Sequence, residues 1–263
     1  MISNGKFYES QFEEATIELL REAHWQYAFG DDIHRKYTDP LIEEDLRNFL
    51  TVQYKDKNLT TSEMDSIVAN LRNTGGQNDY YALRNAFLLY RDGYDFAYSD
   101  GRDNPFRLEY IDFEHPDHNI FRCVNQFVME QGRENRRPDI LLFINGIPVC
   151  IIELKNPTKQ NATIHDAHTQ ICTRYMRDIP ALLKYCALAV ISDGAKNALG
   201  TTYTPFEFFY EWKKIENEDK AGKGLDTLRT LIRGALSPER ILEILRDYVY
   251  FPDPTKEDDT TEI

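Results

Sequence analysis

The sequence predicts an α/β fold in which a mixed central sheet is flanked by helices. Three observations predict it. Helical patterns cover residues 9–27 and 39–91, alternating segments rich in aromatic and β-branched residues follow from Arg107, and helical patterns return on either side of a short apolar strand near Leu188. This order of helix, strands, helix, strand and helices is typical of a mixed sheet with helical cover.

The first predicted elements are helical. Residues 9–27 carry an apolar stripe of helical spacing, with Ser10 as a candidate N-cap and Glu13, three positions later, as its capping-box partner. A helical insertion is expected over roughly residues 39–91. It is expected to hold one helix over 39–50, a second capped by Thr61-Ser62 and ending at Leu71, and a third over 79–90, with a loop at Gly75-Gly76.

The strands are predicted next. LEYIDF (108–113) and NIFRCVNQFVME (119–130) alternate as strands do, and residues 135–137 are expected to form a polar turn. The stretch RPDILLFINGIPVCIIELKNP (137–157) reads as two strands around Asn145-Gly146, a strong hairpin-turn signal. The remaining expected elements are a helix over 164–176, a strand over 188–191, an aromatic segment over 206–212, and helices over 225–236 and 238–248.

Composition and charge exclude several classes of protein. The 263 residues carry a formal net charge of −13, which argues against a protein that coats nucleic acid nonspecifically. None of the four cysteines belongs to a CxxC pair, so the sequence predicts no zinc site, and the thiols fit a reducing compartment. Because there is no signal peptide and no apolar run long enough to span a membrane, we expect a cytoplasmic protein without membrane contact.

The hairpin raises a question of charge, because this apolar stretch carries Asp139, Glu153 and Lys155. Residues two apart share a strand face, so Glu153 and Lys155 point the same way. A regular two-residue loop at Asn145-Gly146 would place Asp139 on the other face. A three-residue loop over 145–147, or a bulge, would pair it with Glu153 instead. We predict one of these two irregular pairings.

Two carboxylates that converge repel each other unless a cation lies between them. A hard divalent ion is the natural partner of Asp139 and Glu153, Mg²⁺ in the first place with Mn²⁺ as a substitute. The backbone carbonyl of Leu154 is a further candidate ligand. Such an ion activates water and stabilises charge on a phosphate, and Lys155 adds a positive charge beside it. The alternative is a solvated strand end without a metal.

The wider pattern resembles the PD-(D/E)xK nuclease superfamily. Pro138-Asp139 precedes the first strand of the hairpin, Glu153-Leu154-Lys155 ends the second, and Gln170 follows on a helix. The hairpin, with AHTQICTRYMRDIPALLKY and LAVISDG after it, is similar to the N-terminal endonuclease domain of the restriction (R) subunit of type I restriction enzymes. FEEATIELLREAHWQYAFGD resembles the start of that domain. The resemblance implies a PD-(D/E)xK restriction-endonuclease-like core, and it is weakest over residues 39–91.

The resemblance also implies roles for single residues. Asp139 and Glu153 match the metal-binding acids, Lys155 matches the catalytic lysine, and Gln170 is expected near the metal site and the DNA backbone. Basic residues around this site are expected to meet DNA, although several of them are as well explained as solvated loop charges. They are Arg133, Arg136, Arg137, Lys155, Lys159, Arg174 and Arg177.

One departure from the family pattern concerns its Gln-x-x-x-Tyr motif. Here Gln170 is followed by Tyr175 five positions later, with Arg174 at the fourth, and positions i and i+5 do not share an α-helical face. Whether Arg174 or Tyr175 takes the second role, as a contact to DNA, stays open. Glu13 is a candidate metal ligand, because the superfamily often sends an acid from its first helix toward the metal. Glu14 and a capping or solvent-facing role for Glu13 are the alternatives.

The resemblance implies a metal-dependent endonuclease domain that hydrolyses phosphodiester bonds of double-stranded DNA. We expect this domain over residues 1–255, with a catalytic core at roughly 105–195. Residues 256–263 read as an acidic linker toward an absent translocase region, where ATP would be used. The expected partners are double-stranded DNA and the methyltransferase and specificity subunits of a type I restriction complex. The alternatives are a catalytically silent docking module of nuclease-like fold, and a PD-(D/E)xK nuclease from another restriction or repair system.

Overall fold

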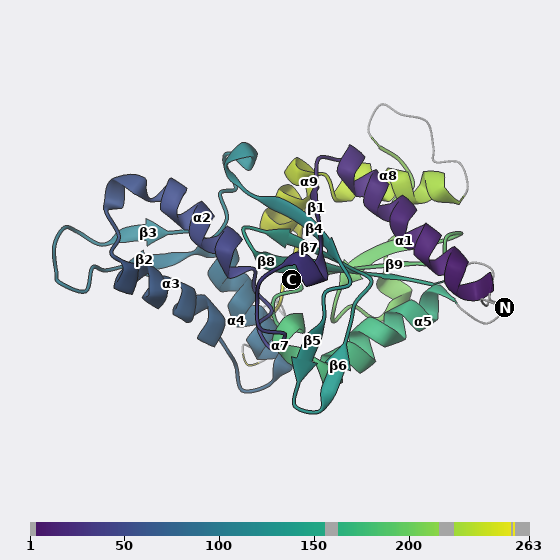
Figure 1. Cartoon of the computed structure of the whole chain (residues 1–263), viewed down its shortest axis with the longest axis horizontal. Helices are drawn as coiled ribbons and strands as arrows, with labels where there is room; N and C mark the ends of the chain where they lie inside the picture. Colours follow the sequence, from purple (N-terminus) through teal and green to yellow (C-terminus); the bar gives the residue numbers. More distant parts are fainter. Residues whose placement is uncertain (1–3, 156–162, 216–223, 254, 256–263) are drawn as a thin grey trace, which may run out of the picture.

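A computed structural model describes residues 4–155, 163–215, 224–253 and 255, with side chains described from residue 10. Its centre is a six-stranded sheet in the order β1-β4-β7-β8-β9-β10 (Figure 1). The strands are β1 (Gln26–Phe29), β4 (Phe121–Asn125), β7 (Ile140–Ile144), β8 (Ile147–Leu154), β9 (Leu188–Ser192) and β10 (Asn197–Thr201). The β1–β4 and β8–β9 pairs are parallel and the other three are antiparallel, which confirms the predicted α/β fold with a mixed sheet.

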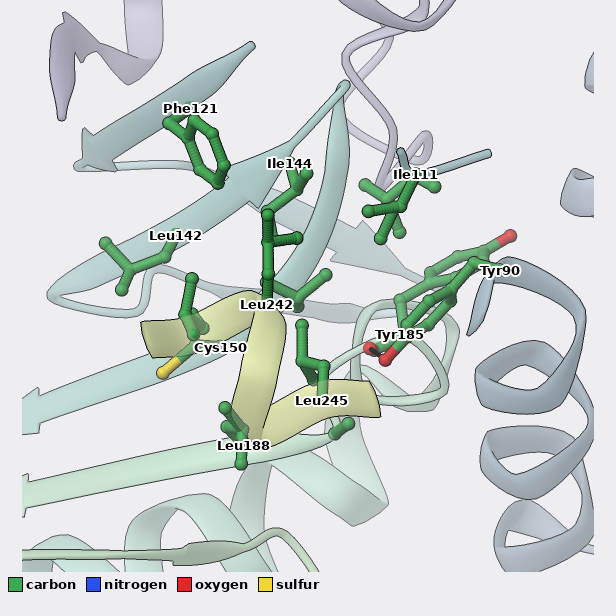
Figure 2. Packing of buried hydrophobic residues seen from close by; sticks show 14 of the residues in the cluster. Tyr90, Ile111, Phe121, Leu142, Ile144, Cys150, Tyr185, Leu188, Leu242 and Leu245 are labelled. Atoms are coloured by element: carbon green, nitrogen blue, oxygen red, sulfur yellow. Dashed lines mark hydrogen bonds between the residues drawn. The ribbon is translucent and has the colours of Figure 1, made fainter. Parts of the chain in front are cut away.

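Helices cover both faces of the sheet, and the alternation along β7 shows how. Leu142 and Ile144 belong to a core shared with α1 (Asn4–Glu22), α8 (Leu225–Ala235) and α9 (Pro238–Glu243). Figure 2 shows Leu242 of α9 packed toward this face of the sheet. Leu141 and Phe143 point to the other face, where the core is shared with α5 (Ile164–Thr169) and α7 (Pro180–Leu183). Both faces are covered, so every residue of β7 and β8 is buried, and all of them except Glu153 are apolar.

The predicted helical region lies in the chain between β1 and β4, which are neighbours in the sheet. It contains α2 (Glu43–Gln53), α3 (Thr61–Asn73) and α4 (Asp79–Asp92), and the hairpin of β2 (Tyr94–Phe96) and β3 (Phe106–Leu108) follows (Figure 1). All three predicted helices are confirmed, with shifted ends. The cap of α3 is Thr60, not Thr61-Ser62, because Thr60 and Glu63 form the reciprocal capping box.

The N-terminal helix was predicted with wrong bounds. It ends at Glu22, and residues 26–29 form β1. His24 adopts a φ of +71°, which no α-helix accommodates, and Trp25 turns into the core, where its Nε1 donates to the carbonyl of Leu236 over 2.6 Å. Ser10 lies inside α1, so the predicted cap at Ser10 is wrong.

The strand predictions between residues 106 and 137 were also partly wrong. LEYIDF forms a strand only up to Leu108, because the segment beyond it is held by side-chain hydrogen bonds of Asn119 and Asn145. The predicted strand 119–130 divides into β4 and β5 (Met129–Gln131), since Gln126 adopts a φ of +55°. Residues 134–136 form β6 (Glu134–Arg136), which pairs with β5 around Gly132, and not the predicted turn.

The C-terminal half contains features that the sequence did not predict. The helix over 164–176 is interrupted by a π-helical segment, Gln170–Tyr175, before α6 (Met176–Asp178). A second π-helical segment, Ile244–Tyr248, follows α9. Strand β10 was missed. A short 3₁₀ helix occurs in this half at Phe206–Phe208, and others occur earlier in the chain at Gly30–Asp32, Lys55–Lys57 and Pro116–His118.

The described part of the chain contains no helix that is both long and apolar enough to cross a membrane. The residues predicted as an acidic linker, 256–263, lie outside the described residues. The sheet extends past the predicted catalytic core of 105–195 at both edges, through β1 and β10.

Candidate active site

The β7–β8 hairpin has the irregular register that the two acids require. The turn is a two-residue one, with Ile144 paired to Ile147, so the predicted three-residue loop is wrong. The alternative, a bulge, is confirmed, because the register shifts between Phe143 and Leu142. Below the bulge Ile140 pairs with Ile152. The next positions on the two strands are Asp139 and Glu153, which therefore face each other at the end of the hairpin.

The turn itself is fixed by two residues in left-handed conformations. Gly146 has a φ of +76°, and a Cβ there would collide with the carbonyl of Ile42. Ile42 is held in this position because its N–H donates to the Gly146 carbonyl over 2.9 Å. Asn145, fully buried, donates from Nδ2 to the carbonyl of Tyr110 over 3.0 Å. The Asn-Gly turn thus anchors the hairpin to the helical region.

Glu153 is the centre of a hydrogen-bonded network at the other end of the hairpin. Its side chain is 1% exposed. Lys155 Nζ donates to Glu153 Oε1 over 2.9 Å and to Gln170 Oε1 over 2.7 Å. The Tyr175 hydroxyl donates to Glu153 Oε2 over 3.3 Å. Glu153 and Lys155 therefore share a strand face, as predicted.

The pKa of the Glu153 carboxyl is raised, because the positive charge near it is too small to offset its burial and the charge of Asp139. Burial raises the pKa of this carboxyl, and the charge of Asp139 raises it further. Lys155 opposes both effects, but the pKa still rises to about 8. At neutral pH the carboxyl would retain its proton unless a further cation were present.

Asp139 is half-buried and tied to the backbone of the opposite strand. Its Oδ2 accepts a hydrogen bond from the Leu154 N–H over 2.7 Å. This bond closes the end of the hairpin and holds the Asp139 carboxylate beside Glu153. The two carboxylates offer oxygen atoms as ligands, which hard divalent cations prefer.

The π-helical segment decides which residue accompanies Gln170. Gln170 Nε2 donates to the Tyr175 hydroxyl over 2.7 Å, and Tyr175 is 3% exposed. Arg174 points to solvent. A π turn places residues five apart on one face, so it absorbs the extra residue of the sequence. Tyr175, and not Arg174, joins the network. A contact of either residue with DNA stays a prediction.

Glu13 lies at the same end of the sheet, at the end of β4. Its Oε1 accepts from Asn125 Nδ2 over 2.7 Å and from Gln126 Nε2 over 3.0 Å. Glu14 is exposed to solvent, which favours Glu13 as the acid of α1 that faces the sheet. Sequence reasoning missed the two amides. The signal that could have revealed them is the polar pair Asn125-Gln126 inside an otherwise apolar strand pattern.

The predicted DNA-binding residues fall into three groups. Arg136 is already neutralised, because its guanidinium contacts Asp178 at 2.7 Å and Glu134. Arg137 and Arg174 are exposed and form no ion pair with a described residue. Lys159 lies outside the described residues.

Comparison with known proteins gives the family. The model of the family described as the type I restriction enzyme R protein N terminus matches residues 6–208. The endonuclease subunit of the type I restriction enzyme HindI from Haemophilus influenzae is 29% identical over 255 residues, which cover 92% of this chain and 24% of that protein. The putative MjaIXP endonuclease subunit from Methanocaldococcus jannaschii is 28% identical over 261 residues, covering 90% and 25% respectively.

The chain spans about a quarter of the length of these two relatives. The family match covers most of the chain and includes the hairpin, the π-helical segment and the end of β4. The chain belongs to the family of type I restriction enzyme R protein N termini.

Proposed function

We propose that this chain is a metal-dependent DNA endonuclease domain with a PD-(D/E)xK core, which hydrolyses phosphodiester bonds of double-stranded DNA. One observation carries the proposal. Asp139, Glu153, Lys155 and Gln170 meet at one end of the sheet, with the carboxylates across the hairpin and the ammonium group bonded to both Glu153 and Gln170. A solvated strand end would not bury Glu153.

The residues fit a hard divalent cation, because the acid at the centre is buried and its pKa is raised to about 8. Asp139, Glu153 and the backbone carbonyl of Leu154 would hold Mg²⁺, or Mn²⁺ in its place, and Glu13 is a weaker candidate. A bound ion of this kind lowers the pKa of a water molecule and neutralises charge on a phosphate.

Lys155 has the position of a residue that orients a nucleophile. The Lys155 side chain is 15% exposed, and its ammonium group is fixed by two acceptors, Glu153 Oε1 and Gln170 Oε1. An ammonium group has three N–H donors, and the described residues accept from two of them, so a third can donate to a water molecule or a phosphate oxygen. Gln170 is in turn held by the Tyr175 hydroxyl, and this arrangement keeps the lysine directed at the reacting phosphate.

The larger assembly is part of the proposal. The relatives are named as endonuclease subunits of type I restriction enzymes and are about four times as long as this chain. We place this chain as the nuclease part of such a subunit, in the cytoplasm, acting on double-stranded DNA together with methyltransferase and specificity subunits. ATP would be used in the translocase region, outside this chain.

A catalytically silent docking module is the competing function. It predicts that Asp139 and Glu153 lie apart. Instead they face each other across the hairpin, and the charge of Asp139 contributes to the raised pKa of Glu153. This proximity favours a nuclease.

The test is cleavage of supercoiled plasmid by the full chain with Mg²⁺ or Mn²⁺. We expect Asp139→Ala, Glu153→Ala and Lys155→Ala to lose nicking while keeping their circular dichroism spectra. Asp95→Ala and Lys213→Ala are matched controls, because both side chains are exposed and distant in the chain from the hairpin. Full activity in any of the three site variants would refute the assigned roles.

Calorimetric titration of Mg²⁺ tests the metal site without requiring turnover. Wild type should bind, and Asp139→Ala should not. Failure of the wild type both to bind the ion and to nick DNA would favour the docking module.

A further inference from the structure

A second cluster of candidate metal ligands lies at the opposite end of the sheet from the proposed nuclease site. It is in the segment between β3 and β4, where Asn119 accepts a hydrogen bond from Asn145 of the hairpin turn over 2.8 Å. Asp139 precedes the other end of β7. Five strand residues span roughly 17 Å, so the two sites do not share ligands.

The cluster consists of Asp112, His115 and His118. One ligand atom from each lies within 4.8 Å of the others, and among the described residues this is the one group of three or more His, Cys, Asp or Glu with that property. His118 Nδ1 is 2.9 Å from Asp112 Oδ2, and His115 Nδ1 is 3.4 Å from the same oxygen. Both imidazoles thus turn the same nitrogen toward one carboxylate.

These separations fit a tetrahedral metal ion. Zinc bonds to imidazole nitrogen and carboxylate oxygen are about 2.0–2.2 Å long, which places neighbouring ligand atoms roughly 3.3 Å apart. The two separations of 2.9 and 3.4 Å lie close to this value on either side. The third separation, between the ligand atoms of the two imidazoles, is within 4.8 Å, and the exposed rings would close it to the same value around an ion.

The local fold prepares the arrangement. Pro116 begins a short 3₁₀ helix, in which residues three apart are eclipsed, and the rings of His115 and His118 stack with centroids 4.8 Å apart. Two further hydrogen bonds hold the Asp112 carboxylate in place. Its Oδ1 accepts from the N–H of His115 over 2.9 Å, and its Oδ2 accepts from Gln53 Nε2 over 3.1 Å.

Charge and exposure also suit a metal ligand set. Burial raises the pKa of Asp112, but hydrogen bonds from the His115 N–H and the His118 ring outweigh it, so the pKa lies below its ordinary value. The carboxylate is therefore an anion at neutral pH. Its side chain is 7% exposed, whereas those of His115 and His118 are 62% and 48% exposed. An ion could enter from solvent and retain a water ligand.

We propose that Asp112, His115 and His118 form a binding site for a divalent transition-metal ion, Zn²⁺ in the first place, separate from the Mg²⁺ site of the nuclease. Imidazole ligands favour Zn²⁺ and its neighbours over Mg²⁺, which prefers oxygen ligands throughout. The CxxC criterion could not detect this site, since its signal is the spacing Asp-x-x-His-x-x-His in DFEHPDH.

The ion would connect two parts of the molecule. Gln53, which bonds Asp112, lies at the end of α2, while Asn119 leads into β4. Ile111, the residue before Asp112, is fully buried near Tyr90 and Ile144 (Figure 2). Because the ion would bind only the folded protein, it should stabilise the junction of the helical insertion and the sheet.

The first experiment is titration of this chain, freed of metal, with Zn²⁺ in the presence of excess Mg²⁺, followed by calorimetry and thermal unfolding. We expect one Zn²⁺ per chain and a higher Tm. His115→Ala and His118→Ala should each weaken binding by about 100-fold or more, since loss of an outer-shell partner alone costs 10- to 100-fold. Both imidazoles are exposed enough for the variants to fold.

Three controls separate this site from others. His165→Ala removes an exposed histidine elsewhere and should bind Zn²⁺ normally. Asp139→Ala should also retain Zn²⁺, since this variant lacks only a nuclease ligand. Gln53→Ala, which removes the hydrogen bond to Asp112 without removing a ligand, should weaken binding about tenfold.

Replacement of Zn²⁺ by Co²⁺ gives a spectroscopic test. Tetrahedral coordination would produce intense visible absorption, lost in His115→Ala and His118→Ala. Absence of Zn²⁺ binding to the wild type, or equal binding to the double variant His115→Ala/His118→Ala, would overturn the proposal. Either outcome would identify the cluster as a hydrogen-bonded loop without a metal. This conclusion is independent of whether the chain nicks DNA.

Discussion

Gln170 and Tyr175 are five residues apart in the chain, yet Gln170 Nε2 donates to the Tyr175 hydroxyl over 2.7 Å. In an α-helix of 3.6 residues per turn, side chains five apart point in different directions. The π-helical segment Gln170–Tyr175 removes this difference, because its hydrogen bonds run to the fifth residue. One extra residue in the sequence is thus accommodated in the backbone, and the side-chain network around Glu153 is preserved.

Tyr175→Phe tests the hydroxyl in this network. The variant keeps the buried ring but removes the group that accepts from Gln170 and donates to Glu153. We expect a loss of roughly 1 kcal/mol in the free energy of unfolding, measured with urea, and reduced nicking because Gln170 no longer holds Lys155 in one place. Unchanged stability together with unchanged nicking would contradict the role given to the hydroxyl.

Deletion of Thr173 tests the π-helical segment. Thr173 is exposed, and its removal leaves Gln170 and Tyr175 four apart, which is the spacing of one α-helical face. We expect a regular helix, an intact network and nicking close to that of the wild type. Insertion of one alanine after Thr173 is the control, since it rotates Tyr175 by a further ~100° and should abolish nicking. Equal loss in both variants would show that the π turn itself is required.

The sequence predicted the site better than it predicted the backbone that builds the site. Asp139, Glu153 and Lys155 could be placed together because strand faces alternate, and the need for a bulge followed from that alternation. The π turn could not be predicted in the same way. The sequence showed the mismatch between Gln170 and Tyr175, but only the tertiary contact with Glu153 decides which residue turns inward.

The errors in the fold have a common physical cause. Alternation reports burial, and it does not report whether the backbone continues as a strand. Tyr110 and Ile111 are fully buried, as the pattern predicts, but their segment is held by the side chains of Asn119 and Asn145 and forms no strand. Left-handed residues such as Gln126 divide strands that look continuous in sequence.

Glu153 should make the stability of the metal-free protein depend on pH. Its pKa is raised to about 8 in the folded chain, against an ordinary value of 4.5. Between these values the folded state binds the extra proton, so stability is highest below pH 4.5 for this group and is lost as pH rises through 8. The effect is on the order of a few kcal/mol.

Thermal unfolding in EDTA at several pH values, compared between wild type and Glu153→Gln, measures this effect. Glu153→Gln has no proton to lose at this position, so its Tm should increase relative to that of the wild type as pH rises. Mg²⁺ should raise the wild-type Tm most at high pH. Parallel curves for the two proteins would show that Glu153 does not titrate in this range.

Arg137 and Arg174 are the exposed basic residues that we expect to contact phosphates. Both lie beside the site, the first before Asp139 and the second within the π-helical segment. Each phosphate contact releases counterions, so loss of one arginine should reduce the slope of log affinity against log salt by about 1. Binding of labelled duplex by Arg137→Gln and Arg174→Gln over a range of salt measures this slope, at low salt because the net charge of −13 makes binding weak.

Arg229→Gln is the control for this measurement, because Arg229 is also exposed but lies on α8, where Asp226 is its ion-pair partner. Its salt slope should equal that of the wild type. Arg136→Gln should differ from all three. Arg136 and Arg177 both pair with the buried Asp178, so loss of Arg136 leaves this acid with one of its two cations and lowers the free energy of unfolding. Equal slopes for Arg229→Gln, Arg137→Gln and Arg174→Gln would move the DNA contact away from this end of the sheet.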